Sequence, residues 1–387
     1  MSLKAETFIL TFFLTVMSSS LSFASEQDIP TLRVGHVGHD HQIALYVAAQ
    51  AGVFLEKNYG VYLRELKPQE VYDLYDKGRL VARVHMVRVG GGSKMPAALE
   101  QGHIEVGLGG LGPVAKFIDK GSPIKVLAPL NNDGDSLILG NGFPAHSWAE
   151  FIREVKASKR LVKIGYKDPM ANAYLIFTRA LAEEGVRHGQ EPVGPDGRPV
   201  QVMTVNLQGD ENALPSLEGG LVDGVVVNEP TPTMLVHKRA GHKAADLSTL
   251  PPKDKWKGHP CCVVAASDAA LRDKRDVIKA LLKVIAAGAD LMTKDVEKAI
   301  AAEAVWTKTA PEIGRKSISH VSYVIRPDEA WQKAVETWVD MMMTSNQFQK
   351  NLKGKSVREI DAVILDLRPM NEALSEMKLS PGKGKKN

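Results

Sequence analysis

The residues best suited to chemistry are histidines and cysteines in two separate parts of the chain. Three histidines lie within six residues near the N-terminus, and about 220 residues later another histidine precedes two adjacent cysteines. Imidazole and thiolate groups together suit zinc, nickel or copper, and thiolates favour the cuprous ion. A metal site requires the two segments to meet, and its candidate ligands are His36, His39, His41, His259, Cys261 and Cys262.

These residues also have simpler interpretations. Cys261 and Cys262 are the only cysteines, and adjacent cysteines close only a small strained ring, so an ordinary stabilising disulfide is not available. The pair is therefore two buried thiols, a vicinal disulfide or two soft ligands, and the histidines are exposed loop residues or ligands. A third interpretation is an organic ligand, with histidines donating to a carboxylate or sulfonate and thiols contacting an aromatic ring.

Composition and charge limit the class of protein. The chain has 387 residues, 44% hydrophobic and 24% charged, which is typical of a globular protein with sizeable cores. At about 150 residues per domain, this length predicts two to three units or one two-lobed architecture. The net charge of +4 is small and scattered, which argues against nucleic-acid binding. Three lysines near the C-terminus predict a basic disordered tail at residues 380–387.

The N-terminus predicts export. Lys4 precedes an apolar run from Phe8 to Met17, and the small residues Ser22 and Ala24 follow it, so residues 1–24 have the pattern of a signal peptide. The run is too short for a spanning helix, which needs about 20 apolar residues. We therefore expect a soluble periplasmic protein.

The elements that must position the two clusters alternate between strand-like and helix-like patterns. This alternation predicts parallel sheets with crossover helices. Asp40 is expected to be the N-cap of a helix over residues 41–54, and the chain after Ser267 is predicted to be mostly helical. The segment Leu99–Pro113 can be laid over Leu217–Pro230, which predicts two similar α/β lobes.

Ligands of open parallel sheets gather at the carboxyl ends of the strands. Loops there start helices whose free N–H groups can hold an anion, and glycines let the backbone approach a ligand closely. The predicted ligand-binding residues are His39, His41, Gln42, Gly91, Gly92, Ser93, Gly109, Gly110, Asp135, Asn172, Asn228 and Glu229.

Three segments carry a family resemblance, in this order: LYVAAQAGVFLEKNYGVYLRELK, AALEQGHIEVGLGGLGPVAKFIDKGSPIKVLAPL and ALPSLEGGLVDGVVVNEPTPTML. Over residues 32–268 the chain resembles periplasmic substrate-binding proteins of ABC importers, in the nitrate/sulfonate/bicarbonate and thiamine-pyrimidine-precursor branch. The resemblance implies a two-lobed type II periplasmic binding protein fold with a helical C-terminal region. The expected lobes are residues 31–130 and 131–228, with a return to the first lobe over 229–379.

The resemblance also implies a function. We expect a monomer without a resident cofactor that captures a small anionic or heteroaromatic solute between the lobes and delivers it to a membrane permease and its ATPase. The alternative is an exported protein that binds zinc, nickel, copper or a metal chelate. An enzyme similar to pyrimidine-precursor synthases is a further alternative, but the adjacent cysteines match only part of that group's cysteine-rich run. The sequence contains neither a phosphate-binding P-loop nor an H-E-x-x-H motif, so we expect no enzyme.

Overall fold

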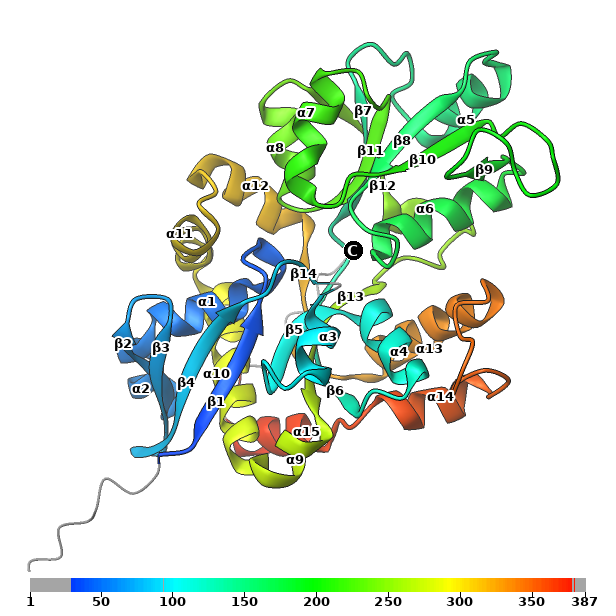
Figure 1. Ribbon diagram of the computed structural model, residues 1–387. Helices are drawn as coiled ribbons and strands as arrows, with labels where there is room; N and C mark the ends of the chain where they lie inside the picture. Colours follow the sequence, from blue (N-terminus) through cyan, green and yellow to red (C-terminus); the bar gives the residue numbers. More distant parts are fainter. Residues whose placement is uncertain (1–28, 93, 378, 380–387) are drawn as a thin grey trace, which may run out of the picture.

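The computed structural model describes residues 29–92, 94–377 and 379. In this part of the chain the strands form two sheets, and helices cover them to give two α/β lobes (Figure 1). The two-lobed α/β fold is thereby confirmed. The predicted signal peptide, Ser93 and the predicted tail at 380–387 lie outside the described residues.

The sheet of the first lobe has, among the described residues, eight strands in the order β14-β6-β13-β5-β1-β4-β3-β2. Its strands are β1 (Thr31–His36), β2 (Val61–Lys67), β3 (Val71–Asp76), β4 (Arg79–Arg88), β5 (Val106–Gly110), β6 (Ile124–Asn132), β13 (Pro260–Ser267) and β14 (Ser322–Tyr323). The helices of this lobe are α1 (Ile43–Gln50), α2 (Gly52–Tyr59), α3 (Met95–Glu100), α4 (Leu111–Lys120), α9 (Asp268–Asp273), α10 (Arg275–Lys294), α11 (Val296–Thr307), α12 (Pro311–His320), α13 (Glu329–Thr344), α14 (Val357–Ile364) and α15 (Arg368–Glu376).

The sheet of the second lobe has, within the described chain, six strands in the order β12-β7-β11-β8-β10-β9. They are β7 (Asp135–Gly140), β8 (Val162–Tyr166), β9 (His188–Gly189), β10 (Val202–Asn206), β11 (Gly224–Asn228) and β12 (Gly241–Asp246). The helices of this lobe are α5 (Trp148–Ala157), α6 (Asn172–Glu183), α7 (Ala213–Glu218) and α8 (Thr231–His237). Because β12 pairs with β7, the second lobe extends beyond the predicted boundary at residue 228, and the chain returns to the first sheet only at Pro260.

The predicted equivalence of the two lobes is confirmed by strand pairing. In the first lobe β5 runs parallel to β1 and antiparallel to β13, and in the second lobe β11 runs parallel to β8 and antiparallel to β7. In each lobe the antiparallel neighbour is the strand that arrives from the other lobe. The sheets are therefore mixed rather than wholly parallel, because the crossover strands β7 and β13 and the strand β3 each run antiparallel to both of their neighbours.

The N-terminal end of α1, where the histidine cluster lies, is held by close helix packing. Asp40–Gln42 form a short 3-10 helix that leads into α1, and α1 packs on α10. A Cβ atom at Gly288 of α10 would lie 2.0 Å from the carbonyl oxygen of Ala44, so only glycine permits this approach. The predicted N-cap is wrong, because His39 and not Asp40 caps the turn by accepting a hydrogen bond from the backbone N–H of His41.

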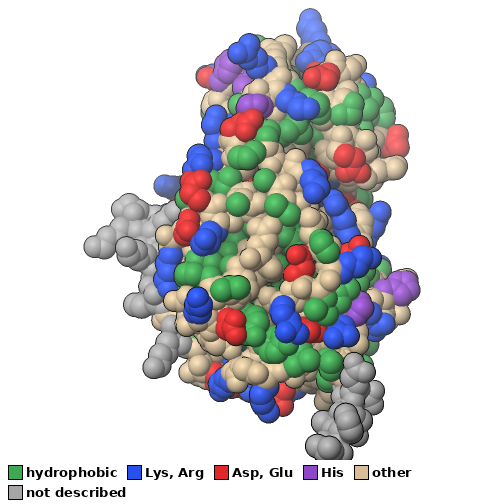
Figure 2. Space-filling model, turned by 90° about the vertical axis from the view of Figure 1, so that its left-hand side faces the viewer, with side chains coloured by type: hydrophobic (Ala, Val, Ile, Leu, Met, Phe, Trp, Pro, Cys, Tyr) green, Lys and Arg blue, Asp and Glu red, His purple; other side chains and the backbone are tan. Residues whose placement is uncertain are grey.

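The outer surface agrees with the small net charge. Lysine and arginine side chains are interspersed with acidic ones over the face shown in Figure 2. In the described residues no helix combines the length and apolar character needed to cross a membrane.

Candidate functional site

A small cavity of about 40 Å³ lies between the two lobes. Its walls come from the 3-10 turn after β1, the ends of β5 and β11, the start of β13, and the loop between β8 and α6. The sequence-predicted residues that line it are His39, His41, Gly92, Gly110, Asp135, Asn172, Asn228, Cys261 and Cys262.

The structure brings together His41, Cys261 and Cys262, although they are about 220 residues apart. Nδ1 of His41 lies 3.3 Å from Sγ of Cys261 and 3.8 Å from Sγ of Cys262. One ligand atom from each residue can be chosen so that all three lie within 4.8 Å of one another, and all three residues are buried. These residues are a set of donors that could hold a metal ion.

A β-bulge explains how both thiols reach the same imidazole. Consecutive residues of a regular strand point to opposite faces of the sheet. On β13, however, Pro260 pairs with Asn132 and Cys262 with Asn131, so Cys261 is an extra residue opposite β6. A bulge of this kind re-aims side chains.

The electrostatics of the cluster favour one shared negative charge on the sulfurs. The hydrogen bond from Cys261, followed by the interaction with His41, outweighs burial and lowers the pKa of Cys262 to about 5. The same hydrogen bond, with burial, raises the pKa of Cys261 well above its usual value. Burial lowers the pKa of His41, but the Cys262 thiolate and Asp40 raise it to about 8. The lower pKa belongs to Cys262, but Cys261 is the sulfur nearer to His41 Nδ1. We therefore assign the thiolate charge to the pair and not to one sulfur.

Asp40 lies behind the imidazole. Its Oδ1 is 3.9 Å from Nε2 of His41, and its side chain is fully buried. In the described part of the chain, neither Asp40 oxygen nor His41 Nε2 has a hydrogen-bond partner. On the same side, a Cβ atom at Gly134 would lie 2.9 Å from Nε2, so the imidazole packs against a position that must lack a side chain.

His259 joins the two chain segments that connect the lobes. Its Nε2 is 2.9 Å from Oδ2 of Asp135, and its Nδ1 is 3.2 Å from Oδ1 of Asp133. Burial lowers the pKa of His259, but the hydrogen bonds to both carboxylates raise it to about 10. His259 is therefore a cationic structural link between the first crossover and the second, and the structure does not place it in the sulfur cluster.

The second lobe contributes a different set of groups. Lys167, directly after β8, is 3.1 Å from Asp210 and hydrogen-bonded to Asn228. Burial lowers the pKa of Lys167, and the Asp210 carboxylate raises it to a net value above normal. At the start of α6, Nδ2 of Asn172 donates to the carbonyl oxygens of Pro260 (3.0 Å) and Cys261 (3.3 Å), so this lobe touches the bulged strand directly.

Some predicted residues lie elsewhere. Gln42 accepts from Val37 N–H and donates to the Leu108 carbonyl, so its amide joins β1 to β5 and does not line the cavity. Gly91 and Gly109 are also outside the lining. A Cβ atom at Gly109 would lie 2.8 Å from Met95 Cε, which indicates a packing role.

His36 and Glu229 also have structural partners. The His36 ring packs edge-on against Trp306, and burial lowers the pKa of His36 to about 4. His36 is a neutral core residue and is not near enough to join the donor set. Glu229 accepts from the backbone N–H of Thr233 in the first turn of α8, and its Oε1 is 2.7 Å from Nδ1 of His320 on α12.

Sequence reasoning missed Asp40 and Lys167 as parts of the site. Lys167 follows β8 directly, at the end of a strand where ligands are expected, and this position was a usable signal. Asp40 was interpreted as a helix cap, since aspartate is a preferred N-cap and the sequence does not show which residue starts the turn.

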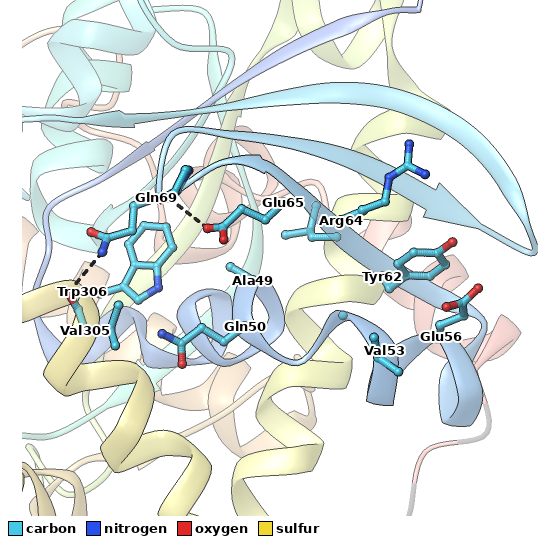
Figure 3. Close-up of a pocket in the computed structure, with 13 residues that line it drawn as sticks. Ala49, Gln50, Val53, Glu56, Tyr62, Arg64, Glu65, Gln69, Val305 and Trp306 are labelled. Carbon is cyan, nitrogen blue, oxygen red and sulfur yellow. Dashed lines mark hydrogen bonds between the residues drawn. The ribbon is translucent and has the colours of Figure 1, made fainter.

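A larger groove of about 660 Å³ lies on the first lobe, between α1, β2 and the end of α11 (Figure 3). Its charged groups already have partners. Arg64 donates to Asp73 at 2.8 Å, and Glu65 accepts from Tyr72 and from the backbone of Gln69. The groove is larger than the interlobe cavity but lacks histidine and cysteine among its lining residues.

Comparisons with known proteins agree with this architecture. An uncharacterized protein of Methanocaldococcus jannaschii is 34% identical over 113 residues, which are 29% of this chain and 78% of the relative. The periplasmic nitrate-binding protein NrtA from Synechocystis PCC 6803 is similar with a TM-score of 0.66 at 16% identity, covering 92% of this chain and 93% of that one.

Two further structures have the same fold. The ligand-binding component of an ABC-type import system from Staphylococcus aureus, with zinc bound, has a TM-score of 0.65 at 14% identity and covers 89% of this chain and 98% of that one. The alkanesulfonate-binding protein SsuA from Xanthomonas axonopodis pv. citri, bound to MOPS, has a TM-score of 0.61 at 14% identity. This similarity covers 83% of this chain and 96% of that one.

The resemblance to periplasmic binding proteins of the nitrate and sulfonate branch is therefore confirmed at the level of the fold. The family model described as the NMT1-like family matches residues 25–306, which is most of the sequence, and the chain belongs to this family.

Proposed function

We propose that this protein is a soluble periplasmic binding protein that captures a small solute between its lobes and delivers it to an ABC import permease with its ATPase. The observation that carries the proposal is the interlobe cavity, to which both lobes contribute side chains. Solved proteins of this fold bind solutes as different as nitrate, a sulfonate buffer and zinc, so the cavity's own residues must decide the cargo.

The mechanism is hinge closure about the two crossovers. The open form is sampled without ligand, and ligand favours the closed form because only there do both lobes contact it. Asn172 is one such interlobe contact, since its amide reaches β13 of the first lobe. This mechanism needs no bond to be made or broken, so the proposal is binding and not catalysis.

The experiment is native mass spectrometry and elemental analysis of protein purified without chelator from the periplasmic fraction. The proposal predicts recovery in that fraction and a retained small molecule or ion. Re-adding this ligand to stripped protein should reduce the radius of gyration in small-angle scattering and raise the melting temperature by mass action. A confirmed ligand that causes no compaction would contradict the closure mechanism.

Delivery is tested separately. Cells that lack this gene should lose uptake of the identified solute, and the wild-type gene should restore it. Unchanged uptake would remove the transport role while leaving the binding role in place.

A further inference from the structure

We infer that the cavity binds a thiophilic transition-metal ion, Cu⁺ or Zn²⁺, through the sulfurs of Cys261 and Cys262 and Nδ1 of His41. The inference rests on the proposed function only in treating the ion as cargo. The coordination itself follows from the positions of these three side chains.

The donor spacing matches a shared ion. With Zn–S bonds of about 2.3 Å and Zn–N bonds of about 2.0 Å, a tetrahedral angle places nitrogen and sulfur about 3.5 Å apart. The two observed separations from His41 Nδ1, 3.3 and 3.8 Å, lie on either side of this value. These two N–S separations are therefore compatible with one shared ion.

The other side of the imidazole is arranged as in metal sites. A metal-ligating histidine usually directs its second ring nitrogen at a carboxylate or carbonyl, which fixes the tautomer and the ring orientation. With Nδ1 toward the sulfurs, Nε2 of His41 faces Oδ1 of Asp40 at 3.9 Å. Asp40 is fully buried, and in the described chain its carboxylate has no hydrogen-bond partner, which makes it available for this role.

The size of the cavity favours an ion over an organic solute. A cavity needs about 10–15 Å³ by this measure to hold one water, so 40 Å³ holds an ion with one or two waters. Pockets for drug-sized organic ligands measure about 300–1,000 Å³. An exogenous ligand or water can occupy the coordination position that faces the second lobe.

The charges also suit a cation. Two thiolates neutralise a divalent ion, so a Zn²⁺ complex adds no net charge to the buried site. Two thiolates with Cu⁺ leave one negative charge, and the ammonium group of Lys167 lies on the opposite wall of the same cavity. Soft sulfur ligands with imidazole favour these two ions over hard cations such as Mg²⁺ or Ca²⁺.

The test is a competition titration of the reduced, full-length mature protein with a chromophoric chelator, using Zn²⁺ in one arm and Cu⁺ under anaerobic conditions in the other. We expect one equivalent of metal per chain, and the two arms identify the preferred ion. Co²⁺ as a spectroscopic substitute for Zn²⁺ should give thiolate-to-cobalt charge-transfer absorption, a readout that needs no variant.

The variants separate the site from other donors. The double variant Cys261→Ser/Cys262→Ser should lower the affinity by more than about 100-fold, because loss of a ligand exceeds the 10- to 100-fold cost of losing a partner behind it. His103→Ala removes an exposed imidazole outside the cavity and should leave the affinity unchanged. Circular dichroism confirms that each variant is folded.

Three outcomes overturn the inference: no stoichiometric metal on reduced protein, metal that the double variant binds equally well, or a Co²⁺ complex without sulfur charge-transfer bands. A retained organic solute with no metal binding overturns this inference and leaves the proposed function standing. Metal binding together with unchanged metal uptake after deletion of the gene overturns the proposed function and leaves this inference standing.

Discussion

The two walls of the interlobe cavity differ in chemistry. The first lobe supplies both sulfurs and the imidazole, from β13 and from the turn before α1. The second lobe supplies an ammonium group, amides and carboxylates, from Lys167, Asn172, Asn228, Asp135 and Asp168. If the cavity binds the inferred ion, this difference gives the two lobes separate tasks: the first determines which ion binds, and the second covers the ion and determines how long it stays.

Among substitutions that keep both sulfurs, the largest effect on metal affinity is expected at Asp40, which lies on the far side of the His41 imidazole from the cavity. Asp40→Asn keeps the shape of the side chain but weakens the interaction with His41 Nε2, and affinity for the preferred ion should fall about 10- to 100-fold. The stability of the metal-free protein should not fall, because burial raises the pKa of Asp40 to about 7 and the amide replaces a charge that the interior disfavours. Competition titration measures the metal affinity, and chemical denaturation measures the free energy of unfolding.

A purely structural role for Asp40 makes the opposite prediction. In that case Asp40→Asn would lower the free energy of unfolding while the metal affinity per folded molecule stayed the same.

An intermediate effect is expected at the second wall. Asn172→Ala removes one amide that donates to two carbonyls of β13, which should cost about 1 kcal/mol of the closed form. We expect the ion to dissociate about fivefold faster by stopped-flow chelation, with an unchanged Co²⁺ spectrum. Asn141→Ala is a matched control, because Asn141 lies in the same lobe and bonds only to the nearby Arg239 carbonyl in the described chain. A changed spectrum in Asn172→Ala would show that the second lobe takes part in coordination.

The smallest effect is expected at Glu376, in the first lobe but outside the cavity lining. Its carboxylate is 2.6 Å from the buried Lys283 and 2.9 Å from Lys279, and these hydrogen bonds lower the pKa of Glu376 to about 2. Glu376→Gln should cost roughly 1 kcal/mol of stability at pH 7, since the pair is partly exposed to solvent. Metal affinity should not change. This variant therefore separates the stability of the first lobe from the ability of that lobe to bind metal.

The pH dependence of this variant follows from the lowered pKa. A carboxylate with a folded-state pKa of about 2 contributes stability above its ordinary value near 4.5, and this contribution is lost as the pH falls toward 2. Urea denaturation at a series of pH values should therefore show wild type and Glu376→Gln converging below pH 4.5. A difference that persists at pH 2 would contradict the assignment to this ion pair.

Much of the fold could be predicted from periodicity, because it depends on local patterns. The repeated helix–glycine–strand unit predicted the equivalence of β5 and β11 correctly. The boundary of the second lobe could not be placed, because β12 joins that sheet through pairing with β7, which lies about 100 residues earlier.

The site was less predictable, because long-range contacts decide it. In the sequence His36, His41 and His259 are equivalent candidates. Trp306 makes His36 a core residue, two aspartates make His259 a structural link, and only His41 meets the sulfurs. Nothing in the sequence around Cys261 and Cys262 reveals the β-bulge that turns both thiols to one side.

The link through His259 has a consequence for unloading. Cys261 follows His259 by two residues, so the sulfurs lie beside the link between the two crossovers, and all three donors come from the first lobe. Under the proposed hinge mechanism, opening the lobes would uncover a bound ion without stretching its bonds. Transfer of such an ion to a receiving protein would then proceed by associative exchange, in which an incoming thiolate or imidazole displaces Cys261, Cys262 and His41 one donor at a time.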